Sequence, residues 1–506
     1  MIASLPLRDS VFGPDDRLES LAPSWDGEPS LHPHIYRWGG LHYTRTSVVQ
    51  EVIDETTFQI PEIFVCPQGP DCFLVYSPLV GEAGLVNGDT VKVLGLLRTQ
   101  YPNPWLATFA PEQYRYVLNF LRHDTHLLQP KSRFSHRPRL YRGRVDLCLT
   151  SACNLNCTYC FAGAGQRPRF MKWETAKAAI DLTVQRALKD GREEIEVAFQ
   201  GDGEEFVAWP MMRKCTDYVR ELTQRHGLGL RIWAITNGYL NSDMVKWVVG
   251  HLDSLAISLD GPPDIHDAQR PTRGGEGSSS RVIETVRRID QLGGNYSLRA
   301  TITRASVTRM GEIAAYVIEN FRSVRSLVLD PLFPSYVSMQ TGWEPPSVGA
   351  FSDGYLEAQQ IADEAGLRLG YTGFNLHEVS GYHCDAWGIK LAVMPGGLVS
   401  SCPLVATMED ERSGFCIYGR YVNGRFEYEW SKLRRIMARS LKNLPQCANC
   451  MVRWHCAGEC YARLMMVAGH NEPLKSFRCE INRRLFPNEL NRTLAQIDML
   501  AGQQET

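Results

Sequence analysis

The chain has 506 residues, 44% of them hydrophobic, and a formal net charge of −2. This length allows two to four domains with a large core, and the near-neutral charge without a basic stripe speaks against a nucleic-acid partner. No apolar run reaches the ~20 residues of a membrane helix, and the first twenty residues lack the basic and apolar regions of a signal peptide. We therefore expect a cytoplasmic protein with no membrane and no nucleic-acid contacts.

The 15 cysteines are unevenly placed along the chain. In a chain without a secretion signal they indicate metal binding rather than disulfides. Three lie close together near residue 155, and seven more, with Cys416 not counted among them, lie between residues 384 and 479. The other five are most simply small buried apolar residues; they are Cys66, Cys72, Cys148, Cys215 and Cys416.

Residues 31–135 predict a small α+β domain. Within it, Cys72–Pro78 and Gly84–Val86 indicate a hairpin, and Asn87–Thr99 and Pro111–Leu128 are typical of helices. This order loosely resembles the winged-helix recognition elements with which peptide-modifying enzymes hold a leader peptide at a sheet edge. A plain structural cap is the alternative, since fold alone does not establish function.

Residues 143–335 alternate strand and helix patterns in a regular order. We expect strands at Val145–Leu149, Glu194–Gln200, Leu230–Thr236, Ser254–Ser258, Ser297–Thr303 and Ser326–Leu332. We expect helices at Trp173–Asp190, Pro210–Arg225, Ser242–His251, Ser278–Leu292 and Arg309–Asn320. Six such units predict an α/β fold built on a partial, TIM-like (β/α)6 barrel, whose active site lies at the C-terminal ends of the strands.

The segment LCLTSACNLNCTYCFAG follows the first of these strands. Its cysteines, Cys153, Cys157 and Cys160, are spaced CxxxCxxC, whereas zinc sites favour four ligands and CxxC pairs. Three thiolates would leave one iron of a [4Fe–4S] cluster free to bind another ligand. The pattern resembles the CxxxCxΦC signature of radical S-adenosylmethionine (radical SAM) enzymes, with Tyr159 at the aromatic position. A zinc knuckle is the alternative.

The resemblance implies a chemistry. In that family the free iron chelates S-adenosylmethionine, and one electron from the cluster cleaves it to methionine and a 5′-deoxyadenosyl radical, which removes hydrogen from an unactivated carbon. The protein positions these cofactors and excludes water. The three cysteines would then be the catalytic residues, and a flavodoxin or ferredoxin would be the electron donor.

The second strand is followed by Phe199-Gln200-Gly201-Asp202-Gly203-Glu204. This resembles the family's glycine-rich GGE element, which binds the ammonium of the cofactor. Glycines allow close backbone approach, and a carboxylate suits a cation. The resemblance assigns cofactor binding to Gly201, Gly203 and Glu204. The family usually has proline next, where this chain has Glu205; a surface turn is the alternative.

Two further strand ends, Thr236-Asn237-Gly238 and Ser258-Leu259-Asp260-Gly261-Pro262, resemble family elements near the ribose and the methionine carboxylate. The residues carried over to the cofactor site are Tyr159, Asn237, Ser258 and Asp260. Turn chemistry alone would also account for Asn-Gly and Asp-Gly. Arg299, on the fifth strand, would pair either with the cofactor carboxylate or with a structural partner.

The second cysteine group begins with Cys384, twelve residues, Gly397, four residues and Cys402, and continues as CxxCx5Cx3C from residue 447. This order resembles the SPASM domain of peptide-maturing radical enzymes, which holds two auxiliary iron–sulfur clusters, expected here to be [4Fe–4S]. By position, the outer cluster would be bound by Cys447, Cys450, Cys456 and Cys479. The inner cluster would be bound by Cys384, Cys402 and Cys460.

The inner cluster lacks a fourth motif ligand. Some relatives carry another cysteine shortly before the first, but residues 375–383 contain none. The inner cluster would therefore have an open iron, or a ligand such as Cys416 or the substrate. A pair of zinc sites is the alternative for the whole group; these would serve folding only, whereas clusters would pass electrons or bind a substrate thiolate.

The remaining boundaries follow from these motifs. Residues 1–30 are expected to be a loose arm, residues 336–380 a linker with a helix at Phe351–Ala365, residues 381–482 the SPASM domain, and residues 483–506 a tail with a helix at Phe486–Ala501.

Together the resemblances predict a radical SAM/SPASM maturase that oxidises a ribosomally made precursor peptide. An intramolecular thioether or C–C cross-link is the preferred product. The alternatives are a maturase that generates formylglycine in another enzyme, a peptide epimerase, and C–C bond cleavage. The non-enzymatic alternatives are an iron–sulfur scaffold and a zinc-stabilised peptide-binding module. Release of 5′-deoxyadenosine would separate the enzyme from the non-enzymatic alternatives.

Overall fold

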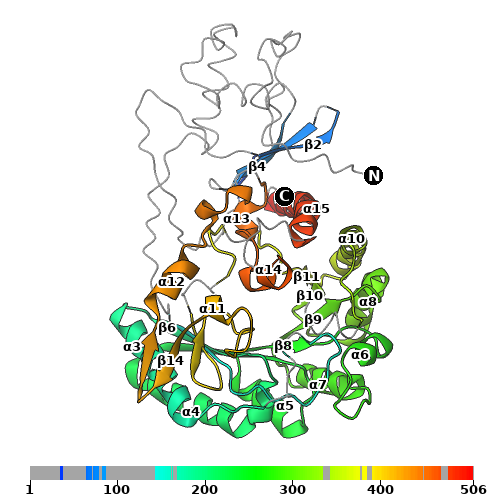
Figure 1. Ribbon diagram of the computed structural model, residues 1–506. Coiled ribbons are helices and arrows are strands. Elements are labelled where there is room, and N and C mark those ends of the chain that lie inside the picture. Colours follow the sequence, from blue (N-terminus) through cyan, green and yellow to red (C-terminus); the bar gives the residue numbers. More distant parts are fainter. Residues whose placement is uncertain are drawn as a thin grey trace, which may run out of the picture.

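A computed structural model describes two regions of the chain (Figure 1). The described residues are 35–37, 64–70, 72–78, 82–86, 143–160, 162, 168–333, 342–376, 379–384, 390–447, 450–468 and 477–504. The expected arm at 1–30 and the expected helices at 87–99 and 111–128 lie outside them.

Six parallel strands form the centre of the larger sheet, and each pairs with the next one along the chain. They are β5 (Arg144–Leu147), β6 (Glu194–Phe199), β7 (Gly229–Thr236), β8 (Ser254–Ser258), β9 (Tyr296–Ile302) and β10 (Ser326–Pro331). Their buried side chains, with Val145, Val197 and Leu298 fully buried, form one continuous core with the surrounding helices. All six predicted strands are confirmed, because a parallel strand covered on both faces leaves an apolar run in the sequence.

Helices between the strands cover the outer face of this sheet (Figure 1). They are α3 (Trp173–Lys189), α4 (Trp209–His226), α5 (Ser242–His251), α6 (Pro263–Gln269), α7 (Ser279–Gln291) and α8 (Met310–Asn320). The five predicted helices are confirmed with their bounds within one residue. Helix α6 was not predicted; it is a short segment that begins at a proline, which suits the first turn.

The sheet extends past the six central strands at both ends. Strand β11 (Arg368–Gly370) pairs in parallel with β10, and β12 (Leu391–Val393) pairs in parallel with β5. Strands β13 (Leu398–Ser400), β14 (Ile417–Val422) and β15 (Arg425–Tyr428) follow in antiparallel order. The cysteine-rich region therefore shares one 11-stranded sheet with the barrel. Gly397, at φ 77°, makes the tight turn between β12 and β13.

The described residues also contain further helices and 3-10 turns. They are α10 (Val348–Glu364), α11 (Ser413–Cys416), α12 (Trp430–Met437), α13 (Arg453–Cys456), α14 (Tyr461–Ala468) and the 3-10 turns Glu205–Ala208, Val307–Arg309, Leu441–Asn443 and Pro445–Cys447. The tail helix is α15 (Phe477–Gln504). The predicted start at residue 486 was wrong by nine residues, because Ile481 and Leu485 are fully buried in the core and extend the helix backwards. Cys479 consequently lies in its first turn.

The predicted N-terminal hairpin is confirmed. Strands β3 (Cys72–Ser77) and β4 (Glu82–Val86) pair antiparallel within a four-stranded sheet of order β1-β4-β3-β2, with β1 at Ile35–Arg37 and β2 at Phe64–Gly69. Leu74 and Tyr76 of β3 pack against Phe486 and Leu490 of α15. This sheet is therefore seated directly on the C-terminal helix, as Figure 1 shows.

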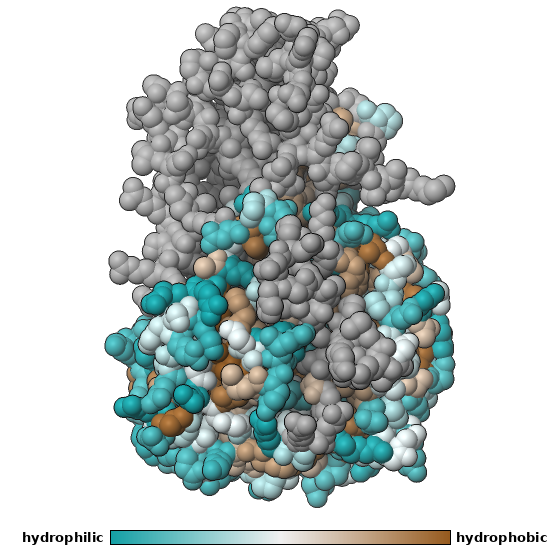
Figure 2. Space-filling model, viewed as in Figure 1, coloured by the Kyte–Doolittle hydropathy of each residue, from teal (hydrophilic) through white to brown (hydrophobic). Residues whose placement is uncertain are grey.

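The surface in Figure 2 carries mostly hydrophilic residues over the helices around the barrel, with apolar residues in small separate groups. In the part of the chain that the structure describes, no helix is both long and apolar enough to cross a membrane.

Candidate cofactor and cluster sites

The CxxxCxxC loop begins where β5 ends, at the C-terminal edge of the parallel strands. The loop is held by the segment after α6. Asn156 donates its backbone N–H to the Pro271 carbonyl at 2.8 Å, Thr158 donates to the Gln269 carbonyl at 3.0 Å, and Arg273 Nε donates to the Cys153 carbonyl at 2.6 Å. These bonds give the loop a defined path without any contribution from a metal.

The three thiols of this loop lie close enough together to influence one another. Burial, followed by the charge of Glu204, raises the pKa of Cys153 to about 12, and Cys157 and Cys160 add to that rise. Burial raises the pKa of Cys157 to about 11, with Cys160 contributing. Such thiols stay protonated at neutral pH until a metal takes the place of the proton, which suits ligands rather than nucleophiles.

The donor set of the loop consists of thiols. Within the described ranges, no three His, Cys, Asp or Glu side chains converge as ligands of one metal ion. Thiolates are the ligands that hold iron–sulfur clusters, and the charges of Cys157 and Cys160 act on Cys153. The chemistry of these donors is therefore compatible with a [4Fe–4S] cluster.

The glycine-rich loop packs directly on the cysteine loop. A side chain at Gly203 would place its Cβ 2.4 Å from the Thr150 carbonyl oxygen and 2.6 Å from that of Ala152. Glu204 donates its backbone N–H to the Ala152 carbonyl at 2.8 Å. Only glycine allows this approach, so Gly203 is needed to bring the second strand end against the cysteines.

Glu204 links three strand ends around Cys153. Its carboxylate is buried and accepts hydrogen bonds from Thr236 Oγ1 at 2.8 Å and from the Asn237 backbone N–H at 2.6 Å. Asn237 Nδ2 in turn lies 2.7 Å from Asn154 Oδ1 and 3.7 Å from Cys153 Sγ. Burial raises the pKa of Glu204 to about 7. The structure thus brings Glu204 and Asn237 together beside the first cysteine.

Replacing Glu204 with glutamine is expected to weaken S-adenosylmethionine binding by on the order of 1.5–3 kcal/mol, the range for a hydrogen bond to a charged group. The measurement is the cofactor dissociation constant of the reconstituted protein, with iron content as a check on cluster loading. Glu205→Gln is the matched control at the neighbouring position. Unchanged binding in Glu204→Gln with weakened binding in Glu205→Gln would assign the role to Glu205.

Glu205 occupies the position where the family usually has proline. Its Oε2 accepts the Leu149 backbone N–H at 2.6 Å, and its side chain is fully buried. Burial raises its pKa far above the usual range for a glutamate, so it is held as the neutral acid. Glu205 therefore fixes the start of the cysteine loop, which explains why β5 ends at Leu147 and not at Leu149 as predicted.

Tyr159 is locked in place by a buried carboxylate. Its hydroxyl donates to Asp260 Oδ2 at 2.6 Å, and the same carboxylate accepts from Arg270 Nε at 2.8 Å, Gln269 Nε2 at 2.7 Å and the Thr301 backbone N–H at 2.9 Å. Burial alone would raise the pKa of Asp260, but the Arg270 guanidinium holds it below its usual range. The Asp260 side chain is therefore placed to position Tyr159 and Arg270 beside the cysteine loop.

The sequence interpretation missed Arg270. Its guanidinium lies 5.4 Å from the centre of the Tyr159 ring. It also opposes the burial-driven rise in the pKa of Cys157, so a buried cation stands beside the second cysteine. No residue pattern marks this arginine, because it follows a short helix whose path over the cysteine loop is a tertiary feature.

An Asp260→Asn substitution is expected to lower the free energy of unfolding by roughly 3–5 kcal/mol, because Arg270 would be left buried without its counter-ion. Urea denaturation followed by circular dichroism measures this change. Asp264→Asn is the control, since Asp264 pairs with Arg309 at the surface with 63% of its side chain exposed, where ion pairs contribute little. Equal losses in the two variants would contradict the assigned role of the buried pair.

Arg299 and Ser258 sit side by side in the β8–β9 register. Ser258 is half-buried at the end of its strand. Arg299 Nη2 lies 3.5 Å from Asp330 Oδ2, and the buried Arg478 lies 3.5 Å from Asp330 Oδ1 and 3.9 Å from Glu459. The contact with Asp330 favours the structural alternative for Arg299. Through Arg478 and Glu459, the same group of charges joins the barrel to the turn between Cys456 and Cys460.

The four cysteines assigned to the outer cluster come together in the structure. Burial raises the pKa of Cys447 to about 11, and the charges of Cys450 and Cys479 add to the rise. Burial raises the pKa of Cys456 as well, with the other three thiols contributing. Asn482 Nδ2 lies 3.2 Å from Cys456 Sγ. A turn, a short helix and the start of α15 therefore bring the four thiols close enough to affect one another electrostatically.

The three cysteines assigned to the inner cluster are not equally placed. Cys402, Cys416 and Cys460 pack in one group of apolar side chains. Cys384 is exposed. Burial lowers the pKa of Lys390, whereas the charges of Asp146 and, to a smaller extent, Cys384 raise it. Lys390 Nζ lies 2.8 Å from Asp146 of β5. Because Cys384 acts on Lys390, Cys384 lies near β5, the strand that precedes the first cysteine loop.

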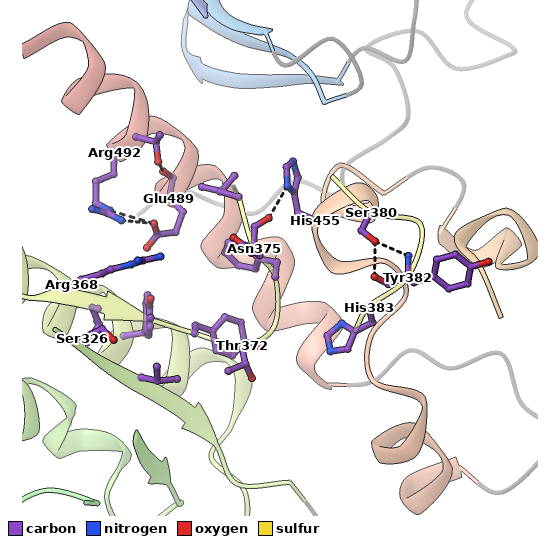
Figure 3. A pocket seen from close by; sticks show the side chains of 18 residues that line it. Ser326, Arg368, Thr372, Asn375, Ser380, Tyr382, His383, His455, Glu489 and Arg492 are labelled. Atoms are coloured by element: carbon purple, nitrogen blue, oxygen red, sulfur yellow. Dashed lines mark hydrogen bonds and ion pairs between the residues drawn. The ribbon is translucent and has the colours of Figure 1, made fainter. Parts of the chain in front are cut away.

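A separate cavity of about 470 Å³ lies where β10, β11 and α15 meet the turns that carry His383 and His455 (Figure 3). His383 Nδ1 is 2.8 Å from the Cys456 carbonyl, and His455 Nδ1 is 2.9 Å from the Asn375 carbonyl. None of the cysteines or cofactor-site residues named above lines it. The cavity therefore borders the outer cysteine group and is distinct from the site at the cysteine loop.

Comparison with known proteins agrees with this geometry. An uncharacterized protein of Methanocaldococcus jannaschii is 27% identical over 189 residues, which are 37% of this chain and 62% of that protein. A cysteine-type anaerobic sulfatase-maturating enzyme of Clostridium novyi is 25% identical over 188 residues, which are 36% of this chain and 50% of that enzyme. The chain thus spans about half to three-fifths of the length of these curated relatives.

A solved structure of native anSMEcpe with bound AdoMet shares the fold, with a TM-score of 0.54 and 17% identity over 70% of this chain and 99% of that chain. The family model of the radical SAM superfamily matches residues 147–304, which contain the cysteine loop, the glycine-rich loop and strands β6 to β9. Residues 147–304 of the chain are therefore similar to the radical SAM superfamily.

Proposed function

We propose that this protein is a radical SAM/SPASM maturase that oxidises a peptide or protein substrate. The observation that carries the proposal is the contact of the CxxxCxxC loop with Gly203, Glu204 and Asn237 at the C-terminal ends of the parallel strands. The match of residues 147–304 to the radical SAM superfamily implies a [4Fe–4S] cluster and S-adenosylmethionine, which together would supply a 5′-deoxyadenosyl radical. Cys153, Cys157 and Cys160 would hold that cluster.

The protein's own residues would bind and orient these groups. Glu204 and Asn237 offer a carboxylate and an amide beside Cys153, which suit the ammonium and carboxylate of the cofactor's methionine. Tyr159, fixed by Asp260, closes one side of the loop. Leu155 and Tyr159 of the loop are buried, and exclusion of water on that side would protect a reactive radical from side reactions.

The second cysteine group distinguishes a maturase from an enzyme that only cleaves its cofactor. After hydrogen abstraction, a two-electron oxidation leaves one more electron to remove. We infer auxiliary clusters at Cys447, Cys450, Cys456 and Cys479 and at the inner group as its acceptors. An intramolecular thioether or C–C cross-link in a precursor peptide is the product we propose. Formylglycine formation is the second candidate, favoured by the match to the sulfatase-maturating enzyme of Clostridium novyi.

The N-terminal sheet supports a role in substrate capture. It presents β1 and β2 as its outer strands, and an extended leader peptide could add to such an edge. Tyr76 of the neighbouring strand is hydrogen-bonded to His455 of α13, so a leader held here would lie beside the outer cysteine group. The proposed reaction takes place in the cytoplasm, with a flavodoxin or ferredoxin as electron donor.

The test is anaerobic reconstitution followed by iron and sulfide counting, assay of 5′-deoxyadenosine, and mass spectrometry of candidate peptides encoded by adjacent reading frames. Cross-linking or oxidation of serine to formylglycine would remove two hydrogen atoms from the peptide. Oxidation of cysteine to formylglycine would exchange sulfur for oxygen and also remove two hydrogen atoms. Epimerisation would leave the mass unchanged. A protein that loads zinc alone, or that releases no 5′-deoxyadenosine when reduced, would refute the proposal.

A further inference from the structure

A cysteine outside the SPASM spacing lies among the inner ligands. Cys416 is the last residue of α11 and directly precedes β14, whereas Cys402 follows β13 and Cys460 precedes α14. Cys402, Cys416 and Cys460 pack into one apolar group with side chains such as Val405 and Ala462. Three chain segments that are distant in sequence therefore bring three thiols to one place.

The main chain holds Cys416 against the loop of Cys402. Ser401, next to Cys402, donates its backbone N–H to the Cys416 carbonyl at 2.8 Å, and Ser400 Oγ donates to the Cys402 carbonyl at 2.8 Å. Cys416 itself is only 2% exposed. Its position is thus set by hydrogen bonds to the ligand loop and not by apolar packing alone.

A buried arginine ties the same loops together. Arg412 has a side chain 4% exposed and is paired with Asp410 at 2.6 Å. Its Nη2 donates to the Leu404 carbonyl at 3.1 Å, and its Nη1 donates to the Ala462 carbonyl at 3.5 Å. Leu404 and Ala462 each lie two residues past a motif cysteine. Arg412 therefore joins the two ligand loops around Cys416 and places a cation beside three thiols that would be anionic as ligands.

Other buried cysteines of the chain are placed differently. Cys148 Sγ donates to the Gln200 carbonyl at 2.7 Å, and Cys215 on α4 packs in the apolar core of the barrel. Neither shares an apolar cluster with a motif cysteine. Burial alone therefore does not bring a cysteine into a group of thiols in this protein.

We propose that Cys416 is the fourth protein ligand of the inner auxiliary cluster, together with Cys384, Cys402 and Cys460. This inference rests on the proposed function, which supplies the cluster. Four thiolates saturate a [4Fe–4S] cluster, so none of its irons is left to bind a substrate thiolate. The inner cluster then exchanges electrons with its surroundings, and the substrate is held elsewhere.

The test compares Cys416→Ala with Cys215→Ala, a buried cysteine away from the motif, in anaerobically reconstituted holoenzyme. Wild type and Cys215→Ala are expected to hold about 12 irons per chain, as three [4Fe–4S] clusters require. Cys416→Ala is expected to keep them on three thiolates with one open iron, and therefore to show a changed electron paramagnetic resonance spectrum after reduction. Wild-type iron content with a wild-type spectrum would overturn the proposal.

A variant at an exposed position covers the case in which Cys416→Ala does not fold. Cys384→Ala is expected to retain its inner cluster on three thiolates with one open iron, so that added dithiothreitol changes its spectrum while leaving the wild-type spectrum unchanged. If Cys416 is not a ligand, only two motif cysteines remain in Cys384→Ala, and loss of about four irons would refute the assignment.

The two levels of the proposal fail in distinguishable ways. Wild-type protein with zinc or with only one cluster overturns the proposed function and the ligand assignment together. Wild-type protein with three clusters, alongside a Cys416→Ala variant that matches Cys215→Ala, overturns the ligand assignment alone.

Discussion

A chain in which Cys153, Cys157 and Cys160 are all replaced by alanine is expected to release no detectable 5′-deoxyadenosine. Only this trio leaves an open iron beside the glycine-rich loop, so its loss removes the site at which the cofactor is cleaved. Iron content is expected to fall from about 12 to about eight per chain, because the auxiliary clusters remain. The measurement is chromatography of 5′-deoxyadenosine after reduction, with iron and sulfide counting in parallel.

Cys215→Ala is the control for a cysteine that is buried but takes no part in the loop. It is expected to cleave the cofactor at the wild-type rate. The hydrogen bonds from Asn156 and Thr158 do not involve the thiols, so the loop should keep its path in the triple variant. Continued 5′-deoxyadenosine formation by the triple variant would show that the assignment of the cofactor site is wrong.

Removal of Cys447 or Cys479 is expected to abolish product formation while some 5′-deoxyadenosine is still released. Hydrogen abstraction requires only the first cluster, whereas completing a two-electron oxidation requires an acceptor for the second electron. Both thiols belong to the outer group, with Cys479 held in the first turn of α15. The measurement is the ratio of modified peptide to 5′-deoxyadenosine, which should fall from near one toward zero.

Each of these variants also removes a ligand from a group that contributes to the fold, since bound metal adds to folding free energy. Circular dichroism and iron content therefore accompany the activity assay, and Cys66→Ala serves as a control outside the SPASM spacing. Cys384→Ala and Cys402→Ala are expected to uncouple the reaction in the same way. A folded variant without auxiliary clusters that still forms the oxidised product at the normal rate would contradict this account.

Much of this protein is determined by local patterns in its sequence. The six central strands and five of their helices follow from apolar runs and amphipathic periods, because a parallel sheet buried on both faces needs both. The cysteine spacings are also local, since they reflect how thiols close together in the chain reach one cluster. Residue types and order alone therefore predicted the parallel core and the cysteine loop at the end of its first strand.

The tertiary structure decided what those patterns do not contain. Glu205 ends β5 by accepting a hydrogen bond from the Leu149 backbone N–H. The Asp260 carboxylate accepts hydrogen bonds from Tyr159 and Arg270. The Glu205–Leu149 and Asp260–Tyr159 contacts join residues far apart in the chain. The same holds for Cys416, which no spacing rule includes. Such pairings depend on which strand ends meet at one edge of the sheet, and side-chain hydrogen bonds across that edge leave no periodic signal in the sequence.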